Sequence, residues 1–139
     1  MMEFNFKIES GDFTNAGSIS SSVKRALKQL NVDGSVIKRT VVALYESEVN
    51  VVAHSHGGEV VVNIFDDCIK INITDSGPGI PDIEKAMTQG FSTASPEVRE
   101  MGFGAGMGLP NIKNNTDDFD LKSEMGVGTV LKFVNYFKA

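Results

Sequence analysis

Apolar and polar residues alternate at the start of the chain and then recur with a helical period. The alternation over residues 4–8 predicts a half-buried strand. From Ser18 to Leu30 the apolar residues fall on one stripe, as in an amphipathic helix, and Ser18 is a suitable N-cap. A longer helix is predicted from about Ser35 to Ser55, and Gly57-Gly58 end it.

The rest of the chain predicts two hairpins with short helices and a long loop between them. Asp66-Asp67 favour a turn between two strand-like runs, and Pro110 is acceptable in the first turn of a helix. A glycine-rich stretch without a clear period predicts a loop long enough to be functional. These predicted elements are strands over residues 59–65, 69–74, 119–123 and 129–137, short helices over residues 81–87 and from Gly108, and a loop over residues 88–107.

The order of these elements favours the α+β class, because strands and helices do not strictly alternate. We expect a two-layer sandwich in which a mixed, mostly antiparallel sheet carries helices on one face. The chain has 139 residues, of which 41% are apolar and 22% charged. Residues 1–139 are therefore expected to form a single domain around one core.

Composition also narrows the classes of partner and compartment. The net charge of −5 disfavours unspecific nucleic-acid binding, because an acidic chain approaches phosphates against its own field. One cysteine, Cys68, allows no internal disulfide and suits a reducing compartment. The first residues do not resemble a signal peptide, and no run approaches the roughly 18 apolar residues of a membrane span. We expect a cytoplasmic protein that binds neither nucleic acid nor membrane.

Two polar residues on the long predicted helix suit a magnesium–phosphate site. Glu46 and Asn50 are four residues apart and therefore project from one face. Magnesium prefers oxygen ligands and often takes only one or two of them from the protein. The carboxylate of Glu46 can also act as a general base toward a hydroxyl or water. Taken alone, the same spacing fits a solvated helix face.

A second candidate segment, Asp75-Ser76-Gly77-Pro78-Gly79-Ile80, directly follows a predicted buried strand. Its glycines allow a sharp turn and the close approach of a ligand. Asp75, at the end of the strand, can accept a hydrogen bond from an exocyclic amine such as that of adenine. An ordinary turn rich in Asp, Gly and Pro is the alternative interpretation.

Two further glycine segments lie nearer the end of the chain. Residues 102–109 place a glycine at every second position before a helix start, which favours a phosphate site of converging backbone N–H groups. The segment is not a P-loop, since no Gly-Lys-Ser/Thr follows it. A flexible linker is the alternative, weakened by the interleaved apolar residues. The last strand opens with Gly126-Val127-Gly128-Thr129, where the Thr129 hydroxyl can join a network around a base.

In this order, the four segments resemble the nucleotide-binding domain shared by gyrase-type ATPases, heat-shock chaperone ATPases, histidine kinases and mismatch-repair ATPases, which has the Bergerat-type fold. Its asparagine box resembles Glu46–Asn50, its two glycine boxes resemble Asp75–Gly79 and Gly104–Leu109, and its terminal Gly-x-Gly-Thr resembles Gly126–Thr129. Within that superfamily the chain is most similar to the free-standing serine/threonine kinases of bacterial partner-switching systems. The Gly-Gly end of the long helix and Gly90-Phe91-Ser92-Thr93 carry this second resemblance.

The resemblance implies a kinase that uses ATP and Mg²⁺ in transcription regulation. It makes Asn50 the magnesium ligand, Glu46 the general base for a partner's serine or threonine hydroxyl, and Asp75 the residue that binds the adenine amino group. The implied substrate is a small anti-sigma antagonist domain, and the implied targets are a sigma factor or a downstream phosphatase. The other nucleotide-binding residues that it implies are Gly77, Gly79, Ile80, Gly104, Gly106, Met107, Gly108, Leu109 and Thr129.

Two other functions remain open at this point. The protein could be a nucleotide-gated anti-sigma binding module without significant kinase activity, although the presence of Glu46 favours catalysis. It could also be a histidine-kinase-like ATPase domain that acts on a separate chain, because the residues before the long helix contain no histidine.

Two features depart from the family pattern. Glu48 falls in the middle of the apolar arc of the long helix, where an unpaired carboxylate would be costly. We expect either that Glu48 is paired or that the helix meets solvent or a partner there, a homodimer contact being one option. Residues 94–101 lengthen the segment that precedes the glycine-rich lid.

Overall fold

The computed structural model describes residues 1–77 and 108–137. Within these residues, five strands form one sheet in the order β1-β2-β3-β5-β4, and every neighbouring pair is antiparallel. The strands are β1 (Met2–Ile8), β2 (Gly58–Ile64), β3 (Cys68–Ser76), β4 (Asp118–Glu124) and β5 (Gly128–Tyr136). The helices are the 3-10 turn η1 (Phe13–Asn15), α1 (Ser18–Gln29), α2 (Gly34–His54) and α5 (Gly108–Asn114).

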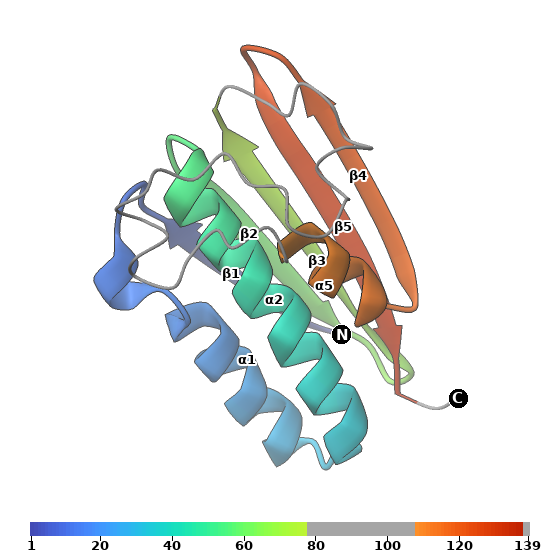
Figure 1. Cartoon of the computed structure of the whole chain (residues 1–139). Helices are drawn as coiled ribbons and strands as arrows, with labels where there is room; N and C mark the ends of the chain where they lie inside the picture. The colour runs from blue at the N-terminus through green and yellow to red at the C-terminus, as the bar shows by residue number, and fades with distance from the viewer. Residues whose placement is uncertain (78–107, 138–139) are drawn as a thin grey trace.

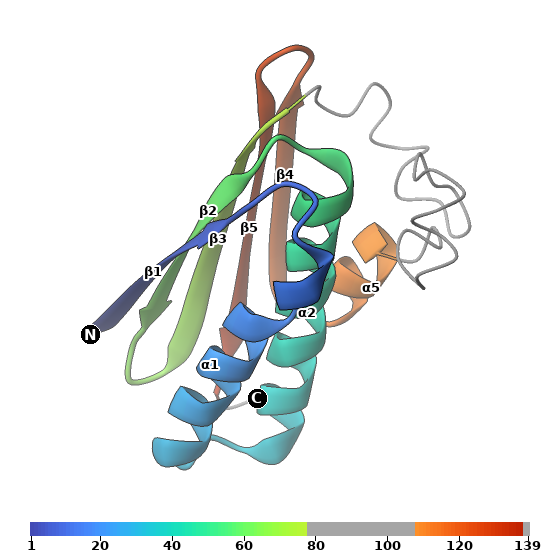
Figure 2. The ribbon, with the colours of Figure 1, turned by 90° about the vertical axis from the view of Figure 1, so that its left-hand side faces the viewer.

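The elements form two layers, with the helices on one face of the sheet (Figures 1 and 2). Helix α2 lies between α1 and α5 and packs against both of them. This arrangement confirms the predicted α+β sandwich. We expected a mixed, mostly antiparallel sheet, and all strand pairs among the described residues are antiparallel. Two predicted elements, the helix over residues 81–87 and the loop over residues 88–107, lie outside the described residues.

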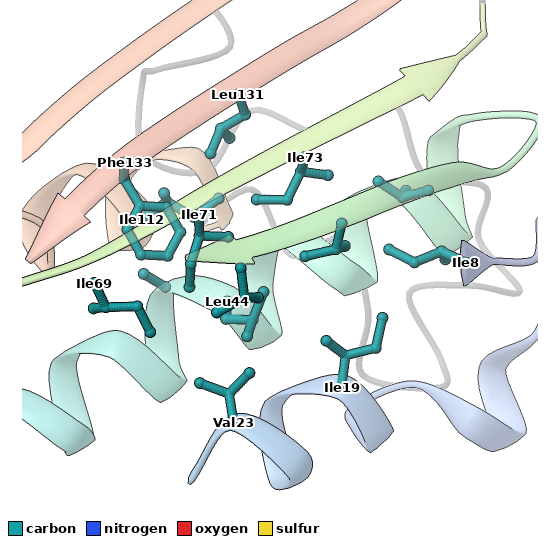
Figure 3. Close-up of a cluster of buried hydrophobic side chains, with 14 of the residues drawn as sticks. Ile8, Ile19, Val23, Leu44, Ile69, Ile71, Ile73, Ile112, Leu131 and Phe133 are labelled. Carbon is teal, nitrogen blue, oxygen red and sulfur yellow. The ribbon is translucent and has the colours of Figure 1, made fainter. Parts of the chain in front are cut away.

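The core lies between the two layers and is built from the alternating inward positions of the strands (Figure 3). On β3, Ile71 and Ile73 point inward, and on β5 Leu131 and Phe133 do the same. The helices add Val23 and Leu44 among others. The predicted period of two along the strands is therefore confirmed.

The two long helices are capped in different ways, and one predicted cap proves wrong. Helix α2 begins after Asp33, whose carboxylate accepts a hydrogen bond from the Ser35 backbone N–H at 2.8 Å, an ordinary N-cap. Helix α1 does not use Ser18 as its cap. Its N-cap is Gly17, which has a φ of 96° and no side chain to cap with. Two backbone N–H groups at the start of α1 are satisfied from another helix, as described below.

Candidate nucleotide-binding site

Glu46 and Asn50 lie one turn apart on α2, as predicted, and both are half-buried. Burial raises the pKa of Glu46, and a hydrogen bond from the side-chain amide of Asn111 on α5 partly offsets that rise. Asn50 forms no hydrogen bond with any other residue that the structure describes. Glu46 is therefore a partly desolvated carboxylate near α5.

Glu46 is accessible from outside the fold. A cavity of about 700 Å³ opens between η1, the N-terminal end of α1 and the outward face of α2, and Glu46 forms part of its wall. The other lining residues include Tyr45 and Lys24, together with small polar side chains of α1. Glu46 can thus be reached from solvent without passing through the core.

Glu48, two residues further along α2, faces α1 and is only 2% exposed. Its Oε2 accepts the Gly17 backbone N–H at 2.9 Å. Its Oε1 accepts both the backbone N–H of Ser20 at 2.7 Å and the Ser20 hydroxyl at 2.6 Å. Glu48 is therefore the N-terminal cap of α1 supplied by a different helix, which explains why Ser18 is not needed as a cap. Of the expected alternatives, pairing is the one that the structure shows.

Asp75 lies at the end of β3 and is half-buried between β2 and β5. Its Oδ1 accepts the Thr129 backbone N–H at 3.1 Å. Burial raises the pKa of Asp75, while the Thr129 hydrogen bond and the nearby His56 act in the opposite direction. The Thr129 hydroxyl lies 3.0 Å from the Ser123 hydroxyl, so Thr129 does join a polar network next to Asp75.

The C-terminal end of α2 and the C-terminal end of β3 meet at the same end of the sheet. The His56 backbone N–H donates to the Ser76 carbonyl at 2.8 Å, and the Ser76 N–H donates to the Gly57 carbonyl at 3.1 Å. Asn50 is one turn before the last residue of α2, and Asp75 directly precedes Ser76. The structure therefore places both predicted nucleotide ligands toward one end of the fold.

The glycines beside Asp75 serve the close approach of backbone segments. A Cβ on Gly128, which has a φ of +146°, would lie 2.0 Å from the Asp75 carbonyl oxygen. A Cβ on Gly58 would lie 2.6 Å from the Thr74 carbonyl oxygen, and one on Gly77 would lie 3.1 Å from Ser55 Cα. Gly77 was predicted to make room for a ligand, which stays a prediction, and the structure shows that it makes room for Ser55. Only glycine allows β2, β3 and β5 to converge here.

Helix α5 brings in residues that the sequence did not single out. Leu109 packs against the core and Ile112 is fully buried, so the helix is anchored in the core beside α2. Asn135 on β5 is fully buried and donates to the Thr40 hydroxyl at 3.0 Å and to the Asn115 carbonyl at 3.1 Å. Its inward position, two residues after Phe133, was the available signal, because a polar residue in a core stripe needs partners.

Of the remaining predicted residues, one is described and five lie outside the described part of the chain. Gly108 is the first residue of α5. The predicted residues that lie outside are Gly79, Ile80, Gly104, Gly106 and Met107.

No helix within the described residues is long and apolar enough to cross a membrane.

Comparison with known proteins places these features in a family. The chain is 31% identical over 131 residues to the serine/threonine-protein kinase RsbT of Bacillus subtilis, covering 91% of this chain and 90% of the relative. It is 28% identical over 141 residues to the anti-sigma F factor of Caldanaerobacter subterraneus, covering 98% and 93%.

A solved structure of the RsbU and RsbW domains of a Mycobacterium tuberculosis protein matches the fold with a TM-score of 0.65 at 15% identity. That match covers 97% of this chain and 32% of the other. The sequence model of histidine kinase-, DNA gyrase B- and HSP90-like ATPases matches residues 35–138. The chain therefore belongs to the family of histidine kinase-, DNA gyrase B- and HSP90-like ATPases.

Proposed function

We propose that the protein is an ATP-dependent serine/threonine kinase of the anti-sigma factor type, which phosphorylates a small antagonist protein in a partner-switching system. The observation that carries the proposal is Glu46. It is a half-buried carboxylate with a raised pKa, it borders an open cavity, and it lies one turn from Asn50. A perturbed carboxylate at such a position is typical of a general base. Relatives named as a kinase and as an anti-sigma factor agree with this chemistry.

The residues around Asp75 fit the adenine end of ATP. An adenine base at this end of the sheet would offer its amino group to the carboxylate of Asp75. Among the described residues, only one oxygen of Asp75 is engaged, by the backbone N–H of Thr129. An ionised aspartate is an acceptor with two oxygens, so the second remains able to bind a donor. Thr129 and Ser123 extend the polar surface beside it.

Asn50 fits the magnesium end of the site. Its side-chain amide has no partner among the described residues, and its oxygen is the type of ligand that Mg²⁺ accepts. A magnesium ion held there would neutralise charge on the phosphates during transfer. The glycine-rich residues that precede α5 belong to the same proposal, as the segment that wraps the phosphates.

In the proposed reaction, Glu46 accepts the proton of the partner's serine or threonine hydroxyl. The hydroxyl oxygen then bonds to the γ-phosphorus of ATP, the bond from that phosphorus to the β–γ bridging oxygen breaks, and ADP leaves. Positioning and electrostatics supply most of the catalysis in phosphoryl transfer, so the geometry around Glu46 matters as much as its basicity.

The first experiment is a calorimetric titration of the purified protein with ATP, with and without magnesium, beside Asn50→Ala and Asp75→Asn. Binding that depends on magnesium and fails in both variants supports the site. Transfer from radiolabelled ATP to a recombinant antagonist protein of the same organism then tests the kinase activity. Absence of ATP binding by the wild type would contradict the proposal.

A second candidate function rests on the similarity to an anti-sigma F factor. In that case the ATP-bound protein would hold a sigma factor, and phosphoryl transfer would be slow or absent. A pull-down of the sigma factor that needs ATP, together with no labelled antagonist, would favour this binding function over the kinase.

A further inference from the structure

A row of polar side chains crosses the end of the sheet on the face that carries the helices. Asp75 on β3 is the register partner of Thr129 on β5, and Thr129 is the register partner of Ser123 on β4 (Figure 1). Side chains of register partners project from the same face of a sheet. Ile73, two residues before Asp75, points into the core, so the row lies on this face. The three side chains are therefore neighbours, with Thr129 in the middle.

The row lies at the border between the core and the polar end of the fold. The next register row further into the sheet consists of Ile73, Leu131 and Leu121. Ile73 and Leu131 are buried, and Leu121 packs against them partly buried (Figure 3). The three residues of the polar row, in contrast, are each partly exposed. Polar groups at the rim of an apolar surface are typical of a site that orients a flat, mostly apolar ligand.

The hydroxyls of Ser123 and Thr129 share a hydrogen bond whose direction is set by a third group. The two oxygens lie 3.0 Å apart, and this distance alone allows either of them to donate. The Ser123 hydroxyl also donates to the Gly128 carbonyl at 3.3 Å, and a carbonyl can only accept. A serine hydroxyl has one proton. Since that proton is used toward Gly128, Ser123 Oγ accepts the proton of the Thr129 hydroxyl.

This direction determines what Thr129 can offer to a ligand. With its proton turned toward Ser123, Thr129 Oγ1 presents lone pairs and acts as an acceptor. The neighbouring Asp75 is an acceptor as well, and only its Oδ1 is engaged by a described residue, the Thr129 backbone N–H at 3.1 Å. Two acceptors therefore lie side by side. They match an amino group, which has two N–H donors, and they do not match a carbonyl oxygen at the same position.

We infer that Ser123 is a specificity-determining residue, which fixes the Thr129 hydroxyl as an acceptor and thereby selects a purine with an amino group over one with a carbonyl oxygen in its place. The inference rests on the proposed ATP site and deepens it. A site built to hydrogen-bond a ligand rejects an analogue that leaves its polar groups unpaired. Ser123 acts through Thr129, so its role is to position that hydroxyl.

The test compares ATP with inosine triphosphate, whose base carries a carbonyl oxygen in place of the amino group. Calorimetry with magnesium gives the ratio of the two dissociation constants for the full chain. We expect inosine triphosphate to bind the wild type at least about 100-fold more weakly than ATP. In Ser123→Ala the Thr129 hydroxyl can turn and donate to the carbonyl oxygen, so this ratio should fall about tenfold. A general loss of stability would change both constants together and leave the ratio as it is.

Two further variants show whether the hydroxyl of Ser123 is responsible. Ser123→Thr keeps a hydroxyl and should retain the wild-type ratio. Lys122→Ala is the control for β4, because Lys122 is exposed and projects from the opposite face of the strand, and it should also retain the ratio. An unchanged ratio in Ser123→Ala, an equal fall in Lys122→Ala, or equal binding of both nucleotides by the wild type would overturn the inference.

A second measurement needs no nucleotide. In isotope-labelled protein, the three-bond couplings from the Thr129 methyl carbon to the backbone nitrogen and carbonyl carbon report the side-chain rotamer. They should indicate one rotamer in the wild type and an average over several in Ser123→Ala. Averaged couplings in the wild type would overturn the role of Ser123. A wild type with one Thr129 rotamer that binds neither nucleotide would instead overturn the proposed ATP site, and the selection of a purine with it.

Discussion

Two carboxylates, Glu46 and Glu48, lie two residues apart on the same helix but have different surroundings and different roles. Glu48 faces α1, is 2% exposed and accepts three hydrogen bonds from the first turn of that helix. Glu46 is half-buried, borders the cavity, and lies near the amide of Asn111 on α5. A turn of 100° per residue separates the two side chains widely around α2, so each meets a different neighbour.

The difference shows what decides whether a buried carboxylate serves structure or chemistry. A carboxylate whose oxygens are all engaged contributes to structure, and removing it leaves the donors of α1 without partners. A carboxylate that is partly desolvated and only partly engaged has a raised pKa and can exchange a proton. Glu48 is thus a structural contact to α1, and Glu46, which borders the cavity beside α1, is where we propose the chemistry.

The largest effect is expected from Glu46→Gln. We expect transfer of phosphate to the antagonist to fall by roughly 10² to 10⁴, because that is the usual contribution of a general base. The free energy of unfolding should change by less than about 1 kcal/mol, since one hydrogen bond to an amide can be replaced by another. Rapid-quench transfer assays and urea titrations measure the two quantities. A stability loss larger than that of Glu48→Ala would contradict the comparison.

Glu48→Ala is the reverse case. It leaves the Gly17 and Ser20 N–H groups of α1 without their cap, and we expect it to lower the free energy of unfolding by about 3 kcal/mol. Urea denaturation beside the exposed control Glu9→Ala measures this, and the control should lose less than about 0.5 kcal/mol. Folded Glu48→Ala protein should still bind ATP. If Glu48→Ala is as stable as the control, the carboxylate does not hold α1.

The sequence suggested a role for Glu46, which stays a prediction, and showed only that Glu48 is anomalous. Glu46 was singled out because Asn50, its partner in the motif, is four residues away on the same helix. The position of Glu48 in an apolar arc was visible, but its partners lie 31 and 28 residues earlier in the chain. Local patterns carry no information about such a contact, and for the same reason Ser18 was wrongly predicted as the cap of α1.

The fold was largely predictable because alternation and helical stripes are local. Predicted strands and helices over the described residues match the observed ones within about two residues. Asn111 could not be found this way, since an asparagine in a short helix near the surface is unremarkable without its neighbour. Gly128 was singled out as part of a motif. The reason why only glycine fits there is the nearby Asp75 carbonyl of the neighbouring strand, which is visible only in the pairing of β3 with β5.

A smaller effect, on pH dependence, follows from the raised pKa of Glu46. The rate of transfer should be high above that pKa and fall as the pH drops through it, because the base must be ionised, and the midpoint should lie above the ordinary value of 4.5. The contribution of Glu46 to the free energy of unfolding has the opposite pH dependence. This contribution is fully present below the pKa of Glu46 in the unfolded chain and is lost as the pH rises through its pKa in the folded protein.

Glu46→Gln supplies the matched control for this pH dependence, because it cannot titrate. Its stability relative to the wild type should increase as the pH rises from below 4.5 toward neutrality. Urea titrations of both proteins at several pH values measure the difference. A difference that stays constant would show that Glu46 is not desolvated in the folded protein.

The smallest effect should come from the ion pair that also joins α2 to the segment after α5. Arg39 Nη2 lies 3.1 Å from Asp117 Oδ1, but the two side chains are 36% and 31% exposed. The pKa of Asp117 is lowered first by the Tyr136 backbone N–H, which donates at 2.8 Å, and less by Arg39. Arg39→Ala should therefore cost less than about 0.5 kcal/mol, and less still at high ionic strength. Urea denaturation at two salt concentrations measures it. A loss above about 1 kcal/mol would mean that surface charge, rather than the buried Asn135, secures α5 beside Glu46.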